Sequence, residues 1–133
     1  MKSIYQGTAA LERIASIAAS SKAIAGVVNL RYLSKLCVTA RVLFASNPDT
    51  DTTINLHYSP DGKTFDTIAF GSITVTKSSA AVVQASKLFD VPQTGWMQIE
   101  VSNGDTSLAI TNVAAWASIA VQFETDRQLT PGT

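Results

Sequence analysis

The stretch from residue 54 to residue 70 reads INLHYSPDGKTFDTIAF and decides the fold class. Its first five residues alternate apolar and polar side chains, which is the period-two pattern of a strand with one buried face. A turn sequence, SPDG at residues 59–62, follows, and after it come the β-prone residues Phe65, Ile68 and Phe70. The pattern predicts a hairpin: a strand, a tight turn and a second strand.

The same alternation recurs along the chain. Further strands are expected at residues 33–46, 71–76, 81–89, 96–102 and 115–124. Turn-forming residues separate them at residues 47–51, 77–79, 92–95 and 103–105. Short strands at intervals of about 8–12 residues are typical of a sandwich or barrel, and one buried face per strand requires two sheets packed together. We therefore predict an all-β fold, an antiparallel two-sheet β-sandwich of jelly-roll type with about eight strands.

Residues 9–28 admit two interpretations. Their apolar residues fit a helical stripe, and Ala is the best helix former. Alternatively, residues 20–22 form a turn between short strands at 14–19 and 23–28. The resemblance described below favours the strands.

The length of the chain, 133 residues, fits one domain with a single core. We divide it into an N-terminal arm at residues 1–8, the jelly-roll sandwich at 9–124 and a polar C-terminal tail at 125–133.

Charge and composition exclude several classes of function. Ten basic and ten acidic residues give a formal net charge of zero, and the basic residues are scattered, so we expect no nucleic-acid partner. Charged residues make up 15% of the chain, against about 25% in an average domain. Ala, Ser and Thr take their place. A neutral surface of small side chains suits flat contact with another protein, because few charges must lose their water.

The single cysteine, Cys37, cannot form a disulfide within the chain, which excludes a disulfide-stapled secreted domain. The first residues, MKSIYQGT, have no apolar core, so we expect no secretion signal. The stretch at 9–28 contains Glu12, Arg13 and Lys22, so we expect no membrane span.

Candidate catalytic residues are few. His57 is the only histidine and alternates with apolar neighbours, so it points away from the core, and it has no partner for an ordinary zinc site. Glu100 and Glu124 face outward on their strands, and nothing in the sequence places them together for glycoside hydrolysis. The Asp61-Gly62 pair fits a hairpin turn better than the Asp box of sialidase-type propellers, which it resembles only faintly.

Asp49 and Asp51, with Asn47, could offer oxygen ligands to Ca²⁺, but the spacing lacks the Gly and the distal Glu of an EF-hand loop. Asp and Asn are also the residues that turns prefer, and a turn is the favoured interpretation. Neither a metal nor a cofactor is expected.

Trp96 and Trp116 sit opposite the main apolar face of their strands. An outward Trp is suited to anchor a partner subunit or to stack on a sugar ring, although a loop that covers the outer face would bury it instead.

Three segments carry a resemblance to a known family: VNLRYLSKLCVTARV at 28–42, YSPDGKTFDT at 58–67 and GWMQIEVSNGDT at 95–106. Together they resemble jelly-roll domains of tailed-phage virion proteins, above all capsid decoration (cement) proteins. The turn at 58–62 and the late strand with its N-x-D-T sequence are also similar to discoidin-like, carbohydrate-binding jelly rolls. The likeness covers residues 10–124.

The resemblance implies a structural virion protein on the capsid exterior, synthesised in the host cytoplasm. It would bind the major capsid protein and bridge neighbouring capsomers, as a homo-oligomer and specifically a trimer at three-fold positions. The alternatives are a carbohydrate-binding module with a glycan partner, and a neck or tail component. No family catalytic residue exists to carry over, so we expect no enzyme. The expected partner contacts are Ile4, Tyr5, Trp96 and Trp116.

Overall fold

The computed structural model describes the backbone of residues 2–124 and the side chains of residues 11–119. This part of the chain forms β1 (Lys2–Ala10), β2 (Ile14–Ile17), β3 (Ser21–Asn29), β4 (Leu33–Leu43), β5 (Thr52–Ser59), β6 (Gly71–Val75), β7 (Val82–Asp90), β8 (Trp96–Asn103) and β9 (Ile110–Glu124). Within it there is no helix that could span a membrane. The predicted tail at 125–133 lies outside the described residues.

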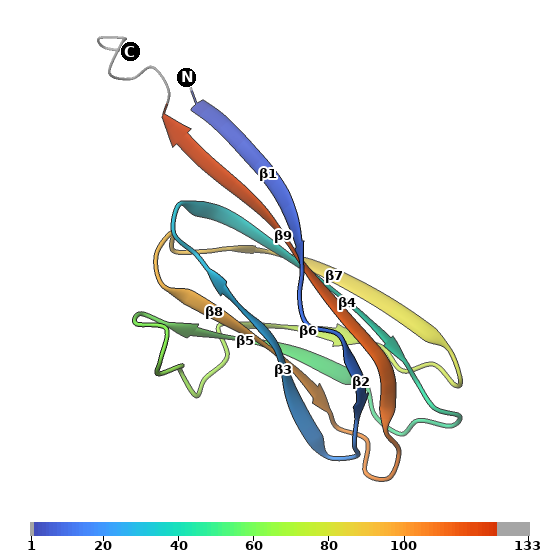
Figure 1. Cartoon of the computed structure of the whole chain (residues 1–133). Helices are drawn as coiled ribbons and strands as arrows, with labels where there is room; N and C mark the ends of the chain where they lie inside the picture. Colours follow the sequence, from blue (N-terminus) through green and yellow to red (C-terminus); the bar gives the residue numbers. More distant parts are fainter. Residues whose placement is uncertain (1, 125–133) are drawn as a thin grey trace.

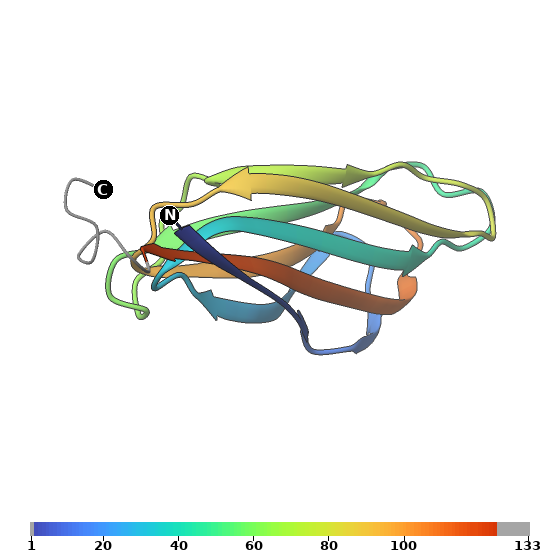
Figure 2. The same ribbon diagram turned by 90° about the horizontal axis from the view of Figure 1, so that it is seen from above.

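The strands form two antiparallel sheets that face each other (Figures 1 and 2). The first, called the β9 sheet, has the order β1-β9-β4-β7, and β2 also pairs with β9. The second, called the β8 sheet, has the order β3-β8-β5-β6. Because β1 and β2 pair with successive parts of β9, they act as one interrupted edge strand. Counted in that way, the strands have the order of a jelly roll, and the predicted all-β sandwich of about eight strands is confirmed.

At the interruption between β1 and β2, the backbone makes hydrogen bonds to both sheets. The backbone N–H of Leu11 donates to the carbonyl of Ala115 in β9, whereas that of Glu12 donates to Ala25 in β3, both at 2.9 Å. Residues 14–17 and 21–29 are therefore strands, and the helical interpretation of residues 9–28 is wrong. Pairing with β8 and β9 satisfies the backbone here and overrides the high helix propensity of the alanines.

Side chains at every second position fill the space between the sheets, as the alternation predicted. In β8, Met97, Ile99 and Val101 are fully buried, while Gln98 and Glu100 lie on the outer face. Burying one such apolar side chain stabilises the fold by about 1.5–3 kcal/mol. The largest of the other fully buried side chains are Phe44, Leu30, Leu36, Ile54, Leu56, Val38, Val42, Val75 and Val113.

The hairpin predicted at 54–70 needs a correction. Its partner strands are β5 and β6, and β6 begins only at Gly71, so residues 60–70 are a loop rather than a tight turn and a strand. The side chain of Asp61 accepts hydrogen bonds from the backbone N–H groups of Lys63 and Thr64 at 2.8 and 2.9 Å. Such local bonds compete with the strand ladder. Ile68, predicted to lie in the second strand, is 83% exposed.

The edge strands β6 and β7 meet along one side of the sandwich, where the ring of Phe89 packs over Gly71. The ammonium of Lys87, on the exposed edge strand β7, donates to the carbonyl of Ser72 in β6 at 3.3 Å. A charged side chain in this position discourages another strand from pairing with the edge.

At one end of the sandwich, β1 and β9 extend past the other strands as a two-stranded ribbon (Figure 1). Pairing between β4 and β9 ends at Leu33 and Val121, whereas β1 stays paired with β9 as far as Lys2 and Glu124. Residues 2–8, which we assigned to an N-terminal arm, are part of β1, and Lys2, Ser3 and Ile4 lie in the projecting ribbon.

Candidate functional site

The outer face of the β9 sheet carries mostly uncharged side chains, several of them small. Neighbouring strands place Cys37 between Leu88 and Ser118, and Thr39 between Ser86 and Trp116. We call this surface the β4–β7–β9 face. It comprises Lys35, Cys37, Thr39 and Arg41 of β4, Gln84, Ser86, Leu88 and Asp90 of β7, and Ala114, Trp116 and Ser118 of β9.

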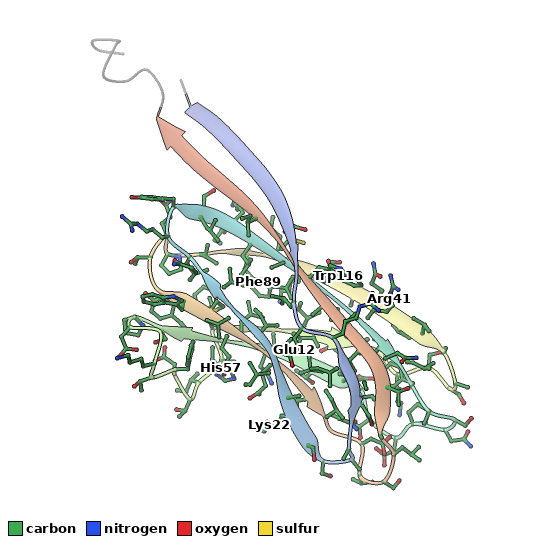
Figure 3. All side chains as sticks on the ribbon, viewed as in Figure 1. Glu12, Lys22, Arg41, His57, Phe89 and Trp116 are labelled. Atoms are coloured by element: carbon green, nitrogen blue, oxygen red, sulfur yellow. The ribbon has the colours of Figure 1, made fainter. Side chains whose placement is uncertain are left out.

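Trp116 is the one large aromatic side chain among these residues, and it is half-buried. The guanidinium carbon of Arg41 lies 5.1 Å from the centroid of its ring (Figure 3). This is the distance of a cation–π contact, which leaves part of the indole surface available to a partner. Trp116 therefore lies on the outer face, as the alternation predicted, and its contact with a partner stays a prediction.

The charges on the β4–β7–β9 face are already engaged within the protein. Lys35 forms an ion pair with Asp90, and Nε of Arg41 donates to the amide oxygen of Gln84 at 3.2 Å. Leu88, in contrast, is 60% exposed. A partner that covers this face would bury exposed apolar surface without separating a charge from its only counterpart.

Trp96 lies on the outer face of the β8 sheet, where the loop after β5 covers it. A Cβ atom added to Gly62 would lie only 3.0 Å from Cδ2 of the indole, so glycine lets the loop rest directly on the ring. Covering by a loop was one of the interpretations that the sequence left open. A partner contact at Trp96 stays a prediction. The loop covers part of the ring, so less of it is accessible to a partner.

Ile4 and Tyr5 lie in β1, opposite Gln122 and Val121 of β9. Their side chains, and that of Glu124, are outside the described part of the structure. Their backbone position places Ile4 in the projecting ribbon and Tyr5 at its base. One edge of β1 pairs with no strand among the described residues.

His57 and Glu100 come together on the outer face of the β8 sheet, which the sequence did not reveal. Nε2 of His57 lies 3.7 Å from Oε1 of Glu100, and both side chains are 14% exposed. The ring is held from the other side, since Nδ1 lies 2.9 Å from the carbonyl oxygen of Asp66. Both residues were known to point outward, but only the register between β5 and β8 makes them neighbours.

Beside this pair lies an open hollow of about 320 Å³ in which Lys22, Phe65, Thr67 and Gln98 meet His57 and Glu100. We call it the β8-sheet groove. Lys22 comes from β3, Gln98 from β8, and Phe65 and Thr67 from the loop after β5, so three separate parts of the chain build it.

The carboxylates considered as Ca²⁺ ligands are engaged in turns. Asp49 accepts hydrogen bonds from the hydroxyls of Thr106 and Thr50, both at 2.6 Å, and Asp51 accepts one from the backbone of Lys77 at 2.8 Å. The bond from Thr106, and then that from Thr50, hold the pKa of Asp49 below its ordinary value. No cluster of three metal-ligating side chains occurs among the described residues. The turn interpretation accounts for these groups.

Asp105 is a buried carboxylate that sequence reasoning missed. It accepts backbone hydrogen bonds from Ser107, Leu108 and Asp49 at 2.8–2.9 Å. The bond from Ser107, followed by that from Asp49, lowers its pKa. Asp61 behaves in the same way, since the backbone N–H groups of Thr64 and Lys63 lower its pKa. These groups fasten loops together and leave no carboxylate poised for acid–base catalysis at these positions.

Comparisons with known proteins agree with the fold and go no further. No family model matches the chain, and no curated protein matches its sequence. Among solved structures, a chain of the disulfide-linked pili of Bacillus endospore appendages is similar at 18% identity and TM-score 0.50, with 93% of this chain and 92% of that chain covered.

Two further structures are similar. BuGH86 in complex with neoagarooctaose matches at 6% identity and TM-score 0.56, over 96% of this chain but only 21% of that chain. The SPBc2 prophage-derived protein YomS matches at 13% identity and TM-score 0.47, over 88% and 94% of the two chains. At identities this low, the endospore-appendage chain and BuGH86 show a similar fold alone, and the TM-score of YomS supports no argument.

Proposed function

We propose that this protein is a structural component of a tailed-phage virion, which decorates the capsid exterior and bridges neighbouring capsomers through its β4–β7–β9 face. The observation that carries the proposal is the character of that face: a half-buried Trp116, an exposed Leu88 and small neutral neighbours, with Lys35 and Arg41 already engaged. The resemblance of residues 10–124 to phage decoration proteins supplies the partner, the major capsid protein.

The surface chemistry suits a passive stabilising role. Burial of apolar surface contributes on the order of 25 cal/mol per Å², and a contact of ordinary size buries about 800 Å² on each partner. A protein that binds only the assembled shell stabilises that shell by mass action. A copy that contacts two capsomers at once also gains from multivalency, because its second contact forms at high effective concentration.

The backbone offers a second element for assembly, the ribbon of β1 and β9. The outer edge of β1 is not paired with another strand among the described residues, and it extends past the sandwich. An unpaired edge can accept a strand from a neighbouring chain. We assign this edge to contacts between copies, in a homotrimer that sits at three-fold positions of the shell.

The decisive experiment is co-sedimentation with shells made from the major capsid protein encoded in the same genome. The purified chain should pellet with expanded shells, and its native mass should be that of a trimer. Trp116→Ala should weaken the binding by roughly tenfold or more, the loss expected when an aromatic anchor is removed. Thr74→Ala, an exposed position on the outer face of the β8 sheet, is the matched control and should bind as the original does.

Two results would overturn the proposal in different ways. A free monomer without affinity for any shell would remove the capsid role altogether. Binding to isolated necks or tails, with none to heads, would keep a virion role and move the protein to another part of the particle.

A further inference from the structure

The β8-sheet groove lies on the opposite side of the sandwich from the β4–β7–β9 face, so the proposed assembly surface leaves it open. Lys22 and His57 both lie on this side (Figure 3). Its hollow of about 320 Å³ is at the lower end of the range of small-molecule sites, about 300–1,000 Å³. The groove is therefore large enough for one sugar-sized ligand.

The position of the His57 ring fixes what it presents to the groove. A backbone carbonyl can only accept, so Nδ1 of His57 donates to Asp66 across 2.9 Å. In the neutral imidazole, Nε2 is then an acceptor, and it faces Oε1 of Glu100 at 3.7 Å. That separation is too long for a direct hydrogen bond, so neither atom satisfies the other, and both residues line the groove.

Hydrogen-bond donors stand next to these acceptors. Within the described part of the chain, neither the ammonium of Lys22 nor the amide of Gln98 has a hydrogen-bond partner, although Gln98 is half-buried. In β8 and β5, Gln98 lies directly opposite His57. A half-buried amide without a partner is costly unless water or a ligand supplies the missing bonds.

We propose that the β8-sheet groove is a binding site for a saccharide, which it holds by a pair of adjacent ring hydroxyls. Each hydroxyl of a diol donates one hydrogen bond and can accept others, which matches acceptors on Glu100 and His57 beside donors on Gln98 and Lys22. The ring of Phe65 in the wall offers an apolar surface to the C–H face of the sugar.

The charges in the groove disfavour other ligand classes. Glu100 repels the multiply charged anions that Lys22 alone would attract. The polar floor disfavours a purely apolar ligand, because its groups would lose water without gaining partners. A shallow site with both hydrogen-bond donors and acceptors remains suited to an uncharged polyol.

The test uses a glycan array that displays hexoses, N-acetylhexosamines, uronic acids and sialic acids, probed with the intact protein. Binding to at least one neutral glycan is expected, and calorimetry with that glycan then gives the affinity. Gln98→Ala and Phe65→Ala should each weaken it by roughly tenfold, the effect of removing one polar partner or one stacking ring. Gln84→Ala, a glutamine on the opposite face, is the matched control and should leave the affinity unchanged.

Absence of binding to every neutral glycan on the array would overturn the proposal, even if an acidic glycan bound. So would glycan binding that survives both Gln98→Ala and Phe65→Ala in variants whose thermal unfolding matches the original. Shell binding is measured separately, so this result can fail while the capsid role stands.

Discussion

The guanidinium of Arg41 lies over the ring of Trp116, 5.1 Å from its centroid, and joins β4 to β9 on the outer face of the β9 sheet. A cation–π contact at a partly exposed site contributes about 0.5–1 kcal/mol. We predict a coupling free energy of that size between Arg41→Gln and Trp116→Leu in a double-mutant cycle measured by urea unfolding. Lys35→Gln, which removes the other cation of the face, should instead add to Trp116→Leu within about 0.5 kcal/mol. If the effects of Arg41→Gln and Trp116→Leu on the free energy of unfolding were strictly additive, the contact would contribute nothing to stability.

Two leucines on adjacent strands differ in position: one lies in the core and the other on the β4–β7–β9 face. Leu36 of β4 is fully buried, whereas Leu88 of β7 is 60% exposed. Leu36→Ala should lower the free energy of unfolding by about 2–5 kcal/mol, because it leaves a cavity between the sheets. Leu88→Ala should change it by no more than about 0.5 kcal/mol and yet weaken shell binding. Equal effects of both variants on unfolding would contradict the assignment of the two faces.

Gly95 occupies a backbone position that other residues rarely adopt, with φ of 86°. An added Cβ atom would also lie 2.5 Å from the hydroxyl oxygen of Tyr58 and 2.6 Å from the carbonyl oxygen of Ser59. The left-handed backbone conformation alone costs a residue with a Cβ atom about 1–2 kcal/mol. Gly95→Ala should therefore lower the free energy of unfolding by more than that amount. Gly104→Ala is the control, since its Cβ would lie 3.0 Å from the methyl group of the exposed Thr50 and no closer than 3.8 Å to a backbone atom. Thermal unfolding of the two variants would refute the argument if Gly104→Ala proved the more damaging.

Acid should weaken the fold through its loop carboxylates. Hydrogen bonds lower the pKa of Asp49, Asp61 and Asp105 in the folded protein, so the unfolded chain binds protons more readily. The stability they contribute is fully present above the unfolded pKa of about 3.9 and is lost as the pH falls through the lower folded values. The urea midpoint of unfolding should stay constant at mildly acidic pH and decrease once the pH is lower than about 4.

Asp105→Asn should lower the midpoint at neutral pH and flatten this acid dependence, because an amide offers only one acceptor oxygen to the N–H groups that the carboxylate now binds. Asp66→Asn, on an exposed part of the loop after β5, is the matched control. An acid dependence that is unchanged by Asp105→Asn would assign the effect to other carboxylates.

The sequence predicted the strands well wherever alternation was strict. In β8, Met97, Ile99 and Val101 alternate with polar residues and all three are buried, so the burial pattern followed directly from the residue order. The outward position of Trp116 could be predicted by the same reasoning. The alanine-rich residues at 14–29 were ambiguous because the propensity of Ala favours a helix, whereas pairing with β8 and β9 makes them strands.

Features that depend on contacts between distant residues could not be predicted. The loop at 60–70 is shaped by the hydrogen bonds of Asp61, and period-two counting took its apolar residues for a strand. Asp49 and Asp105 are 56 positions apart, and each reads alone as an ordinary turn residue. The proximity of His57 to Glu100 required the register of β5 against β8, which the composition of neither strand contains.

The most direct test of the central claim, that the β4–β7–β9 face binds the capsid, uses Cys37, the only cysteine of the chain and a half-buried member of that face. Its rate of maleimide labelling should be measured in the free protein and in shell-bound protein. A second variant, Cys37→Ser with Ser72→Cys, moves the thiol to an exposed position of β6 on the other sheet. If this face binds the capsid, shells protect Cys37 from labelling while the thiol in β6 reacts at its free rate. A Cys37 that stays fully reactive on the shell, beside a protected thiol in β6, would contradict the claim.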